Sequence, residues 1–303
     1  MFFRNLTLFR FPASVGFDDI DARLADVALK PVGPLEPSSR GFVSPFGALD
    51  PDNAVLSHRV GDALWIALGG EDRLLPAAVV NDQLQKKIAE FEASNARRPG
   101  GKMRRQMKDD LLVELMPRAF VRPVRTDALV DLARGVLAVD TASRKVAEGV
   151  VSALREALGS FPALPLAAET APRALLTGWL AGDAPPQGLV LGEECELRDP
   201  ADGGAVVKLQ KMELAGEELA THLDAGRQAA RLALRLDEHV DLVLGDDLVM
   251  RKLKLLDGAV EQLESGERED LRAELDARFA LMAGEFARLF DVLDGALRFS
   301  AAD

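Results

Sequence analysis

Apolar residues recur at helical spacing on both sides of the sequence Pro99-Gly100-Gly101. This spacing predicts one amphipathic helix before the sequence and another after it. Proline ends a helix and glycine gives the backbone the freedom that a chain reversal needs. We therefore predict a helical hairpin, each helix roughly 20–30 Å long at about 1.5 Å per residue. The apolar positions are Val80, Leu84, Ile88 and Phe91 before the turn, and Met103, Met107, Leu111 and Leu115 after it.

The chain before the hairpin predicts the order β-α-β-β. Asp18-Asp19 suit the first turn of a helix, where the macrodipole favours negative charge. Gly61-Asp62 is typical of a turn between two antiparallel strands. The expected elements are a strand over 2–11, a helix from Asp18, a loop over 31–53, and strands over 54–60 and 63–68.

The chain after the hairpin predicts further strands and helices. Proline-rich sequences over 161–165 and 184–186 suggest a domain boundary, and Gly-Asp pairs and Pro-Gly runs suggest hairpins. The expected elements are an extended stretch over 120–132, a strand over 136–139, a helix over 141–158, strands over 195–198 and 205–212 around a turn at 200–204, a long helix over 216–238, strands over 240–244 and 248–256, and one or two helices ending near Arg298.

This order of elements predicts an α+β fold with antiparallel sheets and packed helices. A chain of 303 residues with 48% apolar content is long enough for two or three domains. We expect a central domain over 1–80 and 118–165, a tip formed by the hairpin over 81–117, and a third domain over 166–303.

Charge is distributed unevenly along the chain. Residues 81–125 contain eleven Lys/Arg and six Asp/Glu, a net charge of +5, whereas the other 258 residues have a net charge of −17. Six cations and no acid occur between Arg97 and Lys108. An acidic protein with one projecting basic element is expected to present it to a polyanion. The alternative is an ordinary solvated helix turn. The candidate phosphate contacts here are Lys86, Arg97, Arg98, Lys102, Arg104 and Arg105.

Smaller basic clusters lie in the last third of the chain. Arg227 and Arg231 are expected one helical turn apart on the predicted long helix. Any of these cations alone is typical of a solvated surface, but together they could line one concave surface. The candidate residues are Lys208, Lys211, Arg227 and Lys252.

Phe120 lies between Arg118 and Arg122, just after the helix-ending Pro117. A core position and an exposed anchor for a partner are both open. Aromatic and arginine side chains dominate interface hot spots.

Motifs for catalysis are missing from the sequence. It contains no G-x-x-x-x-G-K-[ST], G-x-G-x-x-G, G-x-S-x-G or H-E-x-x-H. Three separated histidines and the single Cys195 give no metal-ligand or disulfide pattern. Acidic pairs such as Glu193-Glu194 could hold Mg²⁺ in a nuclease, but helix or surface solvation explains them. We expect no enzyme activity, no metal or other cofactor, no membrane span and a cytoplasmic location.

Several short sequences occur in the order and spacing of one known family. The chain resembles the recombination-associated protein RdgC family over essentially its whole length. Each sequence is weak alone, but their order is specific. They are Phe3-Arg4-Asn5-Leu6, Leu74-Leu75-Pro76, 115–120, 159–162, Asp202-Gly203-Gly204, 221–226 and 279–285.

The resemblance implies a nucleoid-associated protein that binds DNA without sequence preference, duplex and also single strands. It implies a ring-shaped homodimer, closed at a base in 166–303 and at the tips, that encircles duplex DNA and limits access of RecA. By position, Phe120 falls at the tip contact, and Arg118, Lys211 and Arg227 fall on the hole. Pro99-Gly100-Gly101 departs from the uniformly polar stretch expected there. A metal-dependent nuclease, or a scaffold whose basic hairpin docks an acidic protein, are the alternatives.

Overall fold

The computed structural model describes residues 3–201, 205–211, 214, 216–259 and 271–301. The chain forms two compact units. Unit 1 contains Met1–Asp26, Ser44–Ala67 and Thr126–Asp303, and unit 2 contains Val27–Val43 and Leu68–Arg125. Two long strands, β4 (Ala63–Leu74) and β5 (Phe120–Asp131), begin in one unit and end in the other. The predicted three-domain division stays a prediction.

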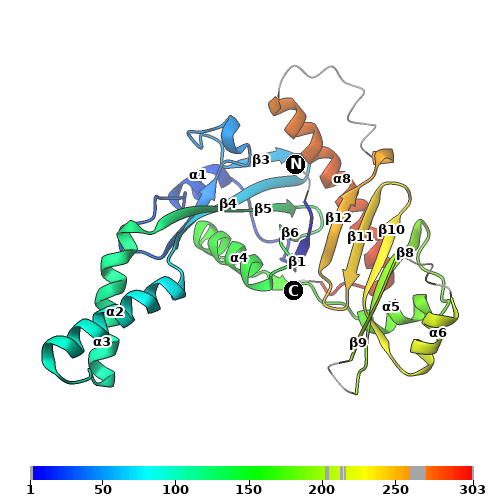
Figure 1. Cartoon of the computed structure of the whole chain (residues 1–303). Helices are drawn as coiled ribbons and strands as arrows, with labels where there is room; N and C mark the ends of the chain where they lie inside the picture. Colours follow the sequence, from blue (N-terminus) through cyan, green and yellow to red (C-terminus); the bar gives the residue numbers. More distant parts are fainter. Residues whose placement is uncertain (1–2, 202–204, 212–213, 215, 260–270, 302–303) are drawn as a thin grey trace. The chain divides into compact units, whose positions relative to one another are not determined.

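Unit 1 is organised by an antiparallel sheet (Figure 1). The strand order is β4-β5-β6-β1-β12-β11-β10-β8-β9, with β3 paired to β4 and β7 paired to β1. This arrangement confirms the predicted α+β class with an antiparallel sheet. Besides β4 and β5, the strands are β1 (Leu6–Arg10), β3 (Ser57–Val60), β6 (Val136–Asp140), β7 (Leu164–Pro165), β8 (Leu189–Arg198), β9 (Val206–Gln210), β10 (Gln228–Leu236), β11 (Val240–Gly245) and β12 (Met250–Leu255).

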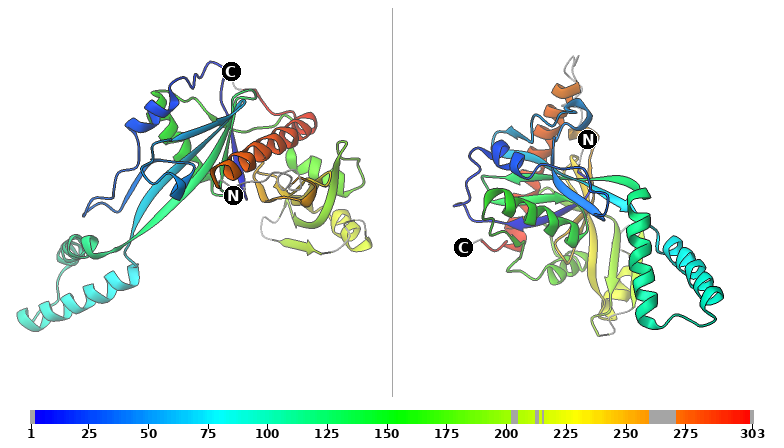
Figure 2. Two further views of the ribbon diagram at one scale, coloured as in Figure 1. Left: turned by 90° about the horizontal axis from the view of Figure 1, so that it is seen from above. Right: turned by 90° about the vertical axis from the view of Figure 1, so that its left-hand side faces the viewer.

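Helices pack against this sheet, and in β1 and β6 both faces are covered: successive side chains of these strands are buried, with Leu8 and Ala138 in a core shared with α8, while α4 also contacts β6. In α8, Met282, Phe286 and Leu289 recur at helical spacing and pack against β11 and β12 (Figures 1 and 2). In α5, the Thr177 hydroxyl accepts a hydrogen bond of 2.9 Å from the Ala229 amide of β10. The helices of unit 1 that lie within the described residues with both ends defined are α1 (Ile20–Asp26), the 3₁₀ turn η1 (Gly47–Leu49), α4 (Arg144–Leu158), α5 (Pro172–Leu180), α6 (Glu217–Asp224) and α8 (Leu271–Leu297).

The predicted long helix over 216–238 is wrong. The helix α6 ends at Asp224, Gly226 takes a φ of +82°, and β10 begins at Gln228. Positive φ is accessible to glycine and stops a helix. Leu232, Leu234 and Leu236 are then buried at a spacing of two, as on a strand. The run of Ala, Leu and Arg has high helix propensity, and tertiary pairing overrides it.

Other differences from the expected elements are smaller. The predicted loop over 31–53 contains a strand, β2 (Ser38–Val43), because its backbone joins the edge of the sheet beside β4. The sequence also did not indicate α5 or the first half of β8. The tip of the 200–204 turn, the last strand residue Met212 and the segment 260–270 lie outside the described residues.

Unit 2 contains the two helices predicted around Pro99-Gly100-Gly101. They are α2 (Ala77–Asn95) and α3 (Gly101–Leu115), which pair as a hairpin and are followed by the 3₁₀ turn η2 (Met116–Arg118) (Figure 1). Val80, Ile88 and Leu111 are the buried residues of the two helices. Unit 2 also includes β2 and the ends of β4 and β5, in the order β2-β4-β5.

Arg134, in the turn between β5 and β6, links that turn to α8 within unit 1. Its Nη1 donates to buried Asp131 at 2.9 Å, and its Nε and Nη2 donate to the two carboxylate oxygens of Asp291 at 2.7 and 2.6 Å. Hydrogen bonds from this guanidinium hold the pKa of Asp291 below its ordinary value.

We expect Arg134→Gln to lower the free energy of unfolding at neutral pH by about 1–3 kcal/mol, because Asp131 loses a charged donor. A lowered folded-state pKa gives stability above the ordinary carboxyl pKa of about 4 that is lost as the pH falls. The difference from the unsubstituted protein should therefore shrink below about pH 4. Urea unfolding at several pH values measures it. The control Arg144→Gln, which loses only an exposed pair with Glu148, should change stability by less than about 0.5 kcal/mol; an equal loss in both variants would contradict the assignment.

Candidate nucleic-acid interface

Unit 2 carries exposed cations around the start of α3. Arg97, Lys102, Arg105 and Lys108 are exposed and form no ion pair with any described residue. Lys102 and Arg105 lie near the N-terminus of α3, which has no acidic residue in its first turn and no side-chain cap. Because the macrodipole makes this end of a helix positive, unpaired cations here are unfavourable until an anion binds. The arrangement is suited to a phosphate.

Two of the predicted cations of this cluster have a structural contact. Arg98 Nε lies 3.5 Å from Glu92 Oε1, and Arg104 Nε donates to the Pro99 carbonyl at 3.1 Å. Lys86, further along α2, is paired with Asp82 at 2.7 Å. These three side chains are therefore less available for a ligand than the four unpaired ones.

Arg118 and Phe120 stand where η2 meets β5. Arg118 is exposed, and the Phe120 ring is 85% exposed. Of the two interpretations of Phe120 left open by the sequence, the exposed position is therefore the observed one. The next residue, Val121, is 42% exposed. Adjacent exposed apolar side chains beside an arginine are typical of a contact surface.

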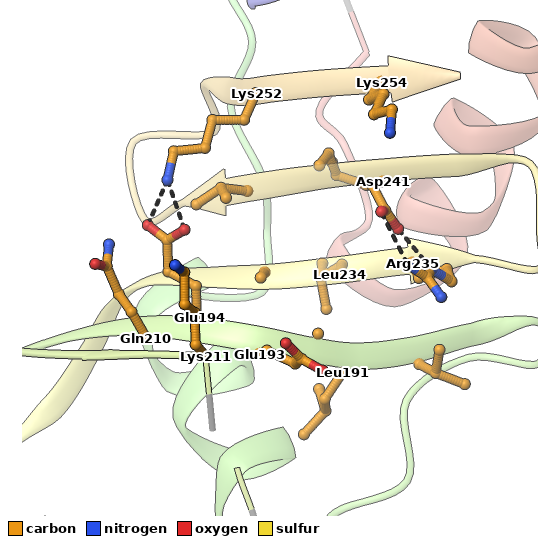
Figure 3. Close-up of a pocket in the computed structure, with 15 residues that line it drawn as sticks. Leu191, Glu193, Glu194, Gln210, Lys211, Leu234, Arg235, Asp241, Lys252 and Lys254 are labelled. Carbon is orange, nitrogen blue, oxygen red and sulfur yellow. Dashed lines mark hydrogen bonds and ion pairs between the residues drawn. The ribbon is translucent and has the colours of Figure 1, made fainter. Parts of the chain in front are cut away.

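Unit 1 has a groove of about 630 Å³ over strands β8, β10, β11 and β12 (Figure 3). The predicted residues Lys211 and Lys252 both line it. The Lys252 ammonium donates to both Glu194 carboxylate oxygens, at 2.8 and 2.5 Å. Arg235 and Asp241 form a second pair in the groove, with N–O distances of 2.6 and 2.9 Å. Two ion pairs therefore neutralise part of the charge in this groove, whereas Lys211 and Lys254 form no ion pair with a described residue.

Lys208, on β9, belongs to a neighbouring row of charges. Its ammonium lies 3.6 Å from Glu196, which also accepts from Arg198 at 2.7 Å and Arg231 at 3.3 Å. Burial alone raises the pKa of Glu196, but the bond from Arg198 and the nearby positive charges outweigh it, so its pKa is lowered. One buried carboxylate is thus surrounded by three cations.

Arg227 follows α6 and does not line the groove. It is not one helical turn from Arg231 as predicted, because Arg231 lies on β10. Its Nη1 lies 2.6 Å from His222 Nδ1, while its Nε is buried without a hydrogen-bond partner among the described residues.

Sequence reasoning missed part of the charged sheet face. Arg198 and Arg235 were not among the candidate residues, and Arg231 was placed on a helix. The signal that could have found them is the alternation on β10, where Arg231 and Arg235 interleave with buried leucines.

In the part of the chain that the structure describes, few side chains are suited to act as a nucleophile or to bind a metal ion. Burial raises the pKa of Cys195 to about 11, so its thiol is unreactive. His58 is paired with Asp276 and His239 with Glu285. Across the described ranges, no group of three or more His, Cys, Asp or Glu side chains could hold a metal ion. None of the helices in these described ranges is long and apolar enough to span a membrane.

Comparison with known proteins defines the class of this α+β protein. Residues 1–299 match the family model described as "Putative exonuclease, RdgC". The chain is 61% identical to proteins of Xanthomonas campestris pv. campestris and Xanthomonas axonopodis pv. citri, and 56% identical to one of Stenotrophomonas maltophilia, each over 100% of both chains. All three are named recombination-associated protein RdgC. The chain belongs to the RdgC family, which confirms the resemblance seen in the sequence.

Proposed function

We propose that this protein binds DNA without sequence preference as a ring-shaped homodimer that encircles the duplex. In this role it modulates recombination by limiting the access of RecA to DNA in the nucleoid, and it also contacts single strands. The observation that carries the proposal is the set of four exposed, unpaired cations, Arg97, Lys102, Arg105 and Lys108, in a protein with a net charge of −12. The names of the relatives point to recombination, in which the common substrate is DNA.

The chemistry of these cations favours phosphate over bases. Phosphate contacts come from Lys, Arg and helix N-termini and carry no sequence information. Within the turn and α3, where the four unpaired cations lie, Gln106 is the only Asn or Gln residue, and it is bonded to Asp110. Base edges are read by laid-out sets of Asn, Gln and Arg side chains. In this proposal the cations therefore contact the phosphate backbone of the duplex and not the base edges.

The ring itself rests on the family resemblance and on Phe120. An aromatic ring that is 85% exposed at the start of β5 suits a contact between the tips of two subunits. The base contact is expected in 166–303, and Arg118, Lys211 and Arg227 face the hole of the ring in this proposal.

The family description also names exonuclease activity, and this is the second candidate function. Incubation of end-labelled duplex with Mg²⁺ or Mn²⁺ separates the two. Intact label supports DNA binding alone. Metal-dependent release of nucleotides that persists through a second purification would assign a nuclease.

We expect binding to random-sequence duplex to depend steeply on salt. If six to eight phosphates are neutralised, log K should fall against log salt with a slope of roughly −5 to −7. Gel shifts or fluorescence anisotropy at four salt concentrations measure the slope. A slope near zero, strong preference for one sequence, or binding only to acidic proteins would contradict the proposal and favour the scaffold alternative.

Replacement of Arg97, Lys102, Arg105 and Lys108 by Gln should weaken DNA binding at least tenfold at about 0.15 M salt and flatten the slope by about 0.9 for each lost phosphate contact. Folding should be unaffected, since exposed substitutions cost within about 0.5 kcal/mol each. A control with the same charge change on unit 1 replaces Arg59, Arg144, Lys145 and Arg155 by Gln. An equal loss of DNA affinity in both variants would show that the effect comes from net charge and not from these four positions.

Phe120→Ala should leave a folded dimer that releases closed circular plasmid faster. A buried aromatic anchor is typically worth about 2 kcal/mol or more, so the tip contact should weaken by roughly thirtyfold. The unsubstituted ring should stay longer on circular than on linear DNA, and the variant should lose this difference. Sedimentation reports the dimer and thermal melting reports the fold. Leu164→Ala, which removes a 64% exposed side chain in unit 1, is the control. An unchanged release rate in the Phe120 variant would show that the Phe120 side chain does not help to close the dimer around DNA.

A further inference from the structure

The side chain of Arg73, near the end of β4, forms hydrogen bonds only to backbone carbonyl groups of the described residues. Its Nε donates to Gly33 at 3.1 Å and its Nη2 to Val32 at 3.4 Å. Its Nη1 donates to Met116 at 3.3 Å and to Ala119 at 3.4 Å. An arginine fork normally meets carboxylate or phosphate. Here it joins two segments that are far apart in the sequence, both within unit 2.

One of these segments presents the proposed contact residues. The Met116 carbonyl also accepts the Ala119 amide at 3.1 Å and so closes η2. Arg73 therefore holds both ends of the turn that carries Arg118. Ala119 directly precedes Phe120, so the same bonds fix the direction in which β5 begins.

The other segment is a firm anchor. The Val32 amide donates to Glu71 Oε2 at 2.8 Å, and the Arg73 amide donates to the Pro37 carbonyl at 2.8 Å. Residues 32–37 are thereby attached to β4 at several points. The guanidinium spans from this anchored loop to the end of the helical hairpin, whose two helices have few buried residues.

Asp72, the residue before Arg73 on β4, holds the start of β5 from the other face of the sheet. Asp72 Oδ2 accepts from Arg122 at 3.2 Å, and its Oδ1 accepts from Arg40 at 2.6 Å. Successive side chains of a strand point to opposite faces. The start of β5 is thus fixed on one face by Asp72 and on the other by Arg73.

We propose that Arg73 is a positioning residue that fixes Arg118 for contact with DNA and Phe120 for contact with a second copy of the chain; this inference rests on the proposed function. Four of the five N–H donors of its guanidinium are accounted for by carbonyl groups, which leaves little for a phosphate. Lysine cannot take its place, because an ammonium is a point charge without the planar fork.

Hydrogen exchange tests the positioning without any DNA. In Arg73→Gln and in Arg73→Lys, the amide of Ala119 and the peptide covering 116–120 should exchange about tenfold faster or more, because the turn opens more often. The control is Arg40→Gln, which removes a neighbouring arginine bonded to Asp72 and should leave 116–120 unchanged. Normal exchange in both Arg73 variants, or full rescue by lysine, would overturn the proposal. The lysine variant also serves if the glutamine variant fails to fold.

The rate of release from closed circular plasmid tests whether Arg73 acts on DNA binding through Arg118 and Phe120. Arg73→Gln should speed release as Phe120→Ala does. In a background that already carries both Arg118→Gln and Phe120→Ala, adding Arg73→Gln should not speed release further. A multiplied effect in that background would show that Arg73 acts by another path and overturn the proposal. If Phe120→Ala itself releases plasmid normally, the tip contact of the proposed function fails, whereas the exchange of 116–120 still decides whether Arg73 positions this segment.

Discussion

One face of the sheet in unit 1 is buried beneath α5 and α8, and this burial directs the charged side chains of β8 to β12 to the opposite face. Leu232, Leu234 and Leu236 belong to the core, while Arg231 and Arg235 alternate with them. Strands only about 5 Å apart bring such side chains into contact across the sheet. Many charges on this face therefore meet partners, and Glu196 and Glu194 are the clearest examples, each paired with cations from other strands.

The helical hairpin is under no such constraint. Few of its side chains are buried, so its surface is open to water along most of its length, and its cations need no carboxylate to offset burial. Four of them form no ion pair with a described residue, and for Lys102 and Arg105, near the start of α3, the macrodipole adds to their repulsion. Positive charge that is not needed for folding, and is slightly unfavourable to it, is the observation on which the proposed DNA binding rests. The groove in unit 1 is different, because its Lys252 is already paired with Glu194.

The sequence predicted the parts of the protein that depend on local pattern. Helical spacing on either side of Pro99 located α2 and α3, and Gly61-Asp62 located the β3–β4 turn, because each of these signals lies within a few residues of its consequence. The charge contrast likewise located the exposed cations of the hairpin. What failed depended on partners distant in the chain. β10 is a strand because it pairs with β8 and β11, and the Lys252–Glu194 pair forms only when residues 58 positions apart meet. The alternation of Leu and Arg on β10 was a local signal for the strand, but no local pattern indicates which distant strands and side chains it meets.

The sequence Pro99-Gly100-Gly101 departs from the uniformly polar stretch expected from the family resemblance, and the turn accommodates it locally. The helix α2 ends at Asn95, Ala96 takes a left-handed φ of 52°, and Gly100 is the extended residue before α3. Pro99 is buried, and its carbonyl accepts the side chain of Arg104, so one cation of the cluster secures the turn. A Cβ at Gly100 or Gly101 would meet no atom within 4 Å and neither residue has a positive φ, so steric need does not explain these glycines. Because Gly100 and Gly101 have no side chains, they leave the backbone at the N-terminus of α3 uncovered. Because Lys102 and Arg105 flank this backbone, a phosphate that approaches it meets amide donors and cations together, and the departure therefore strengthens the case for an anion at the tip.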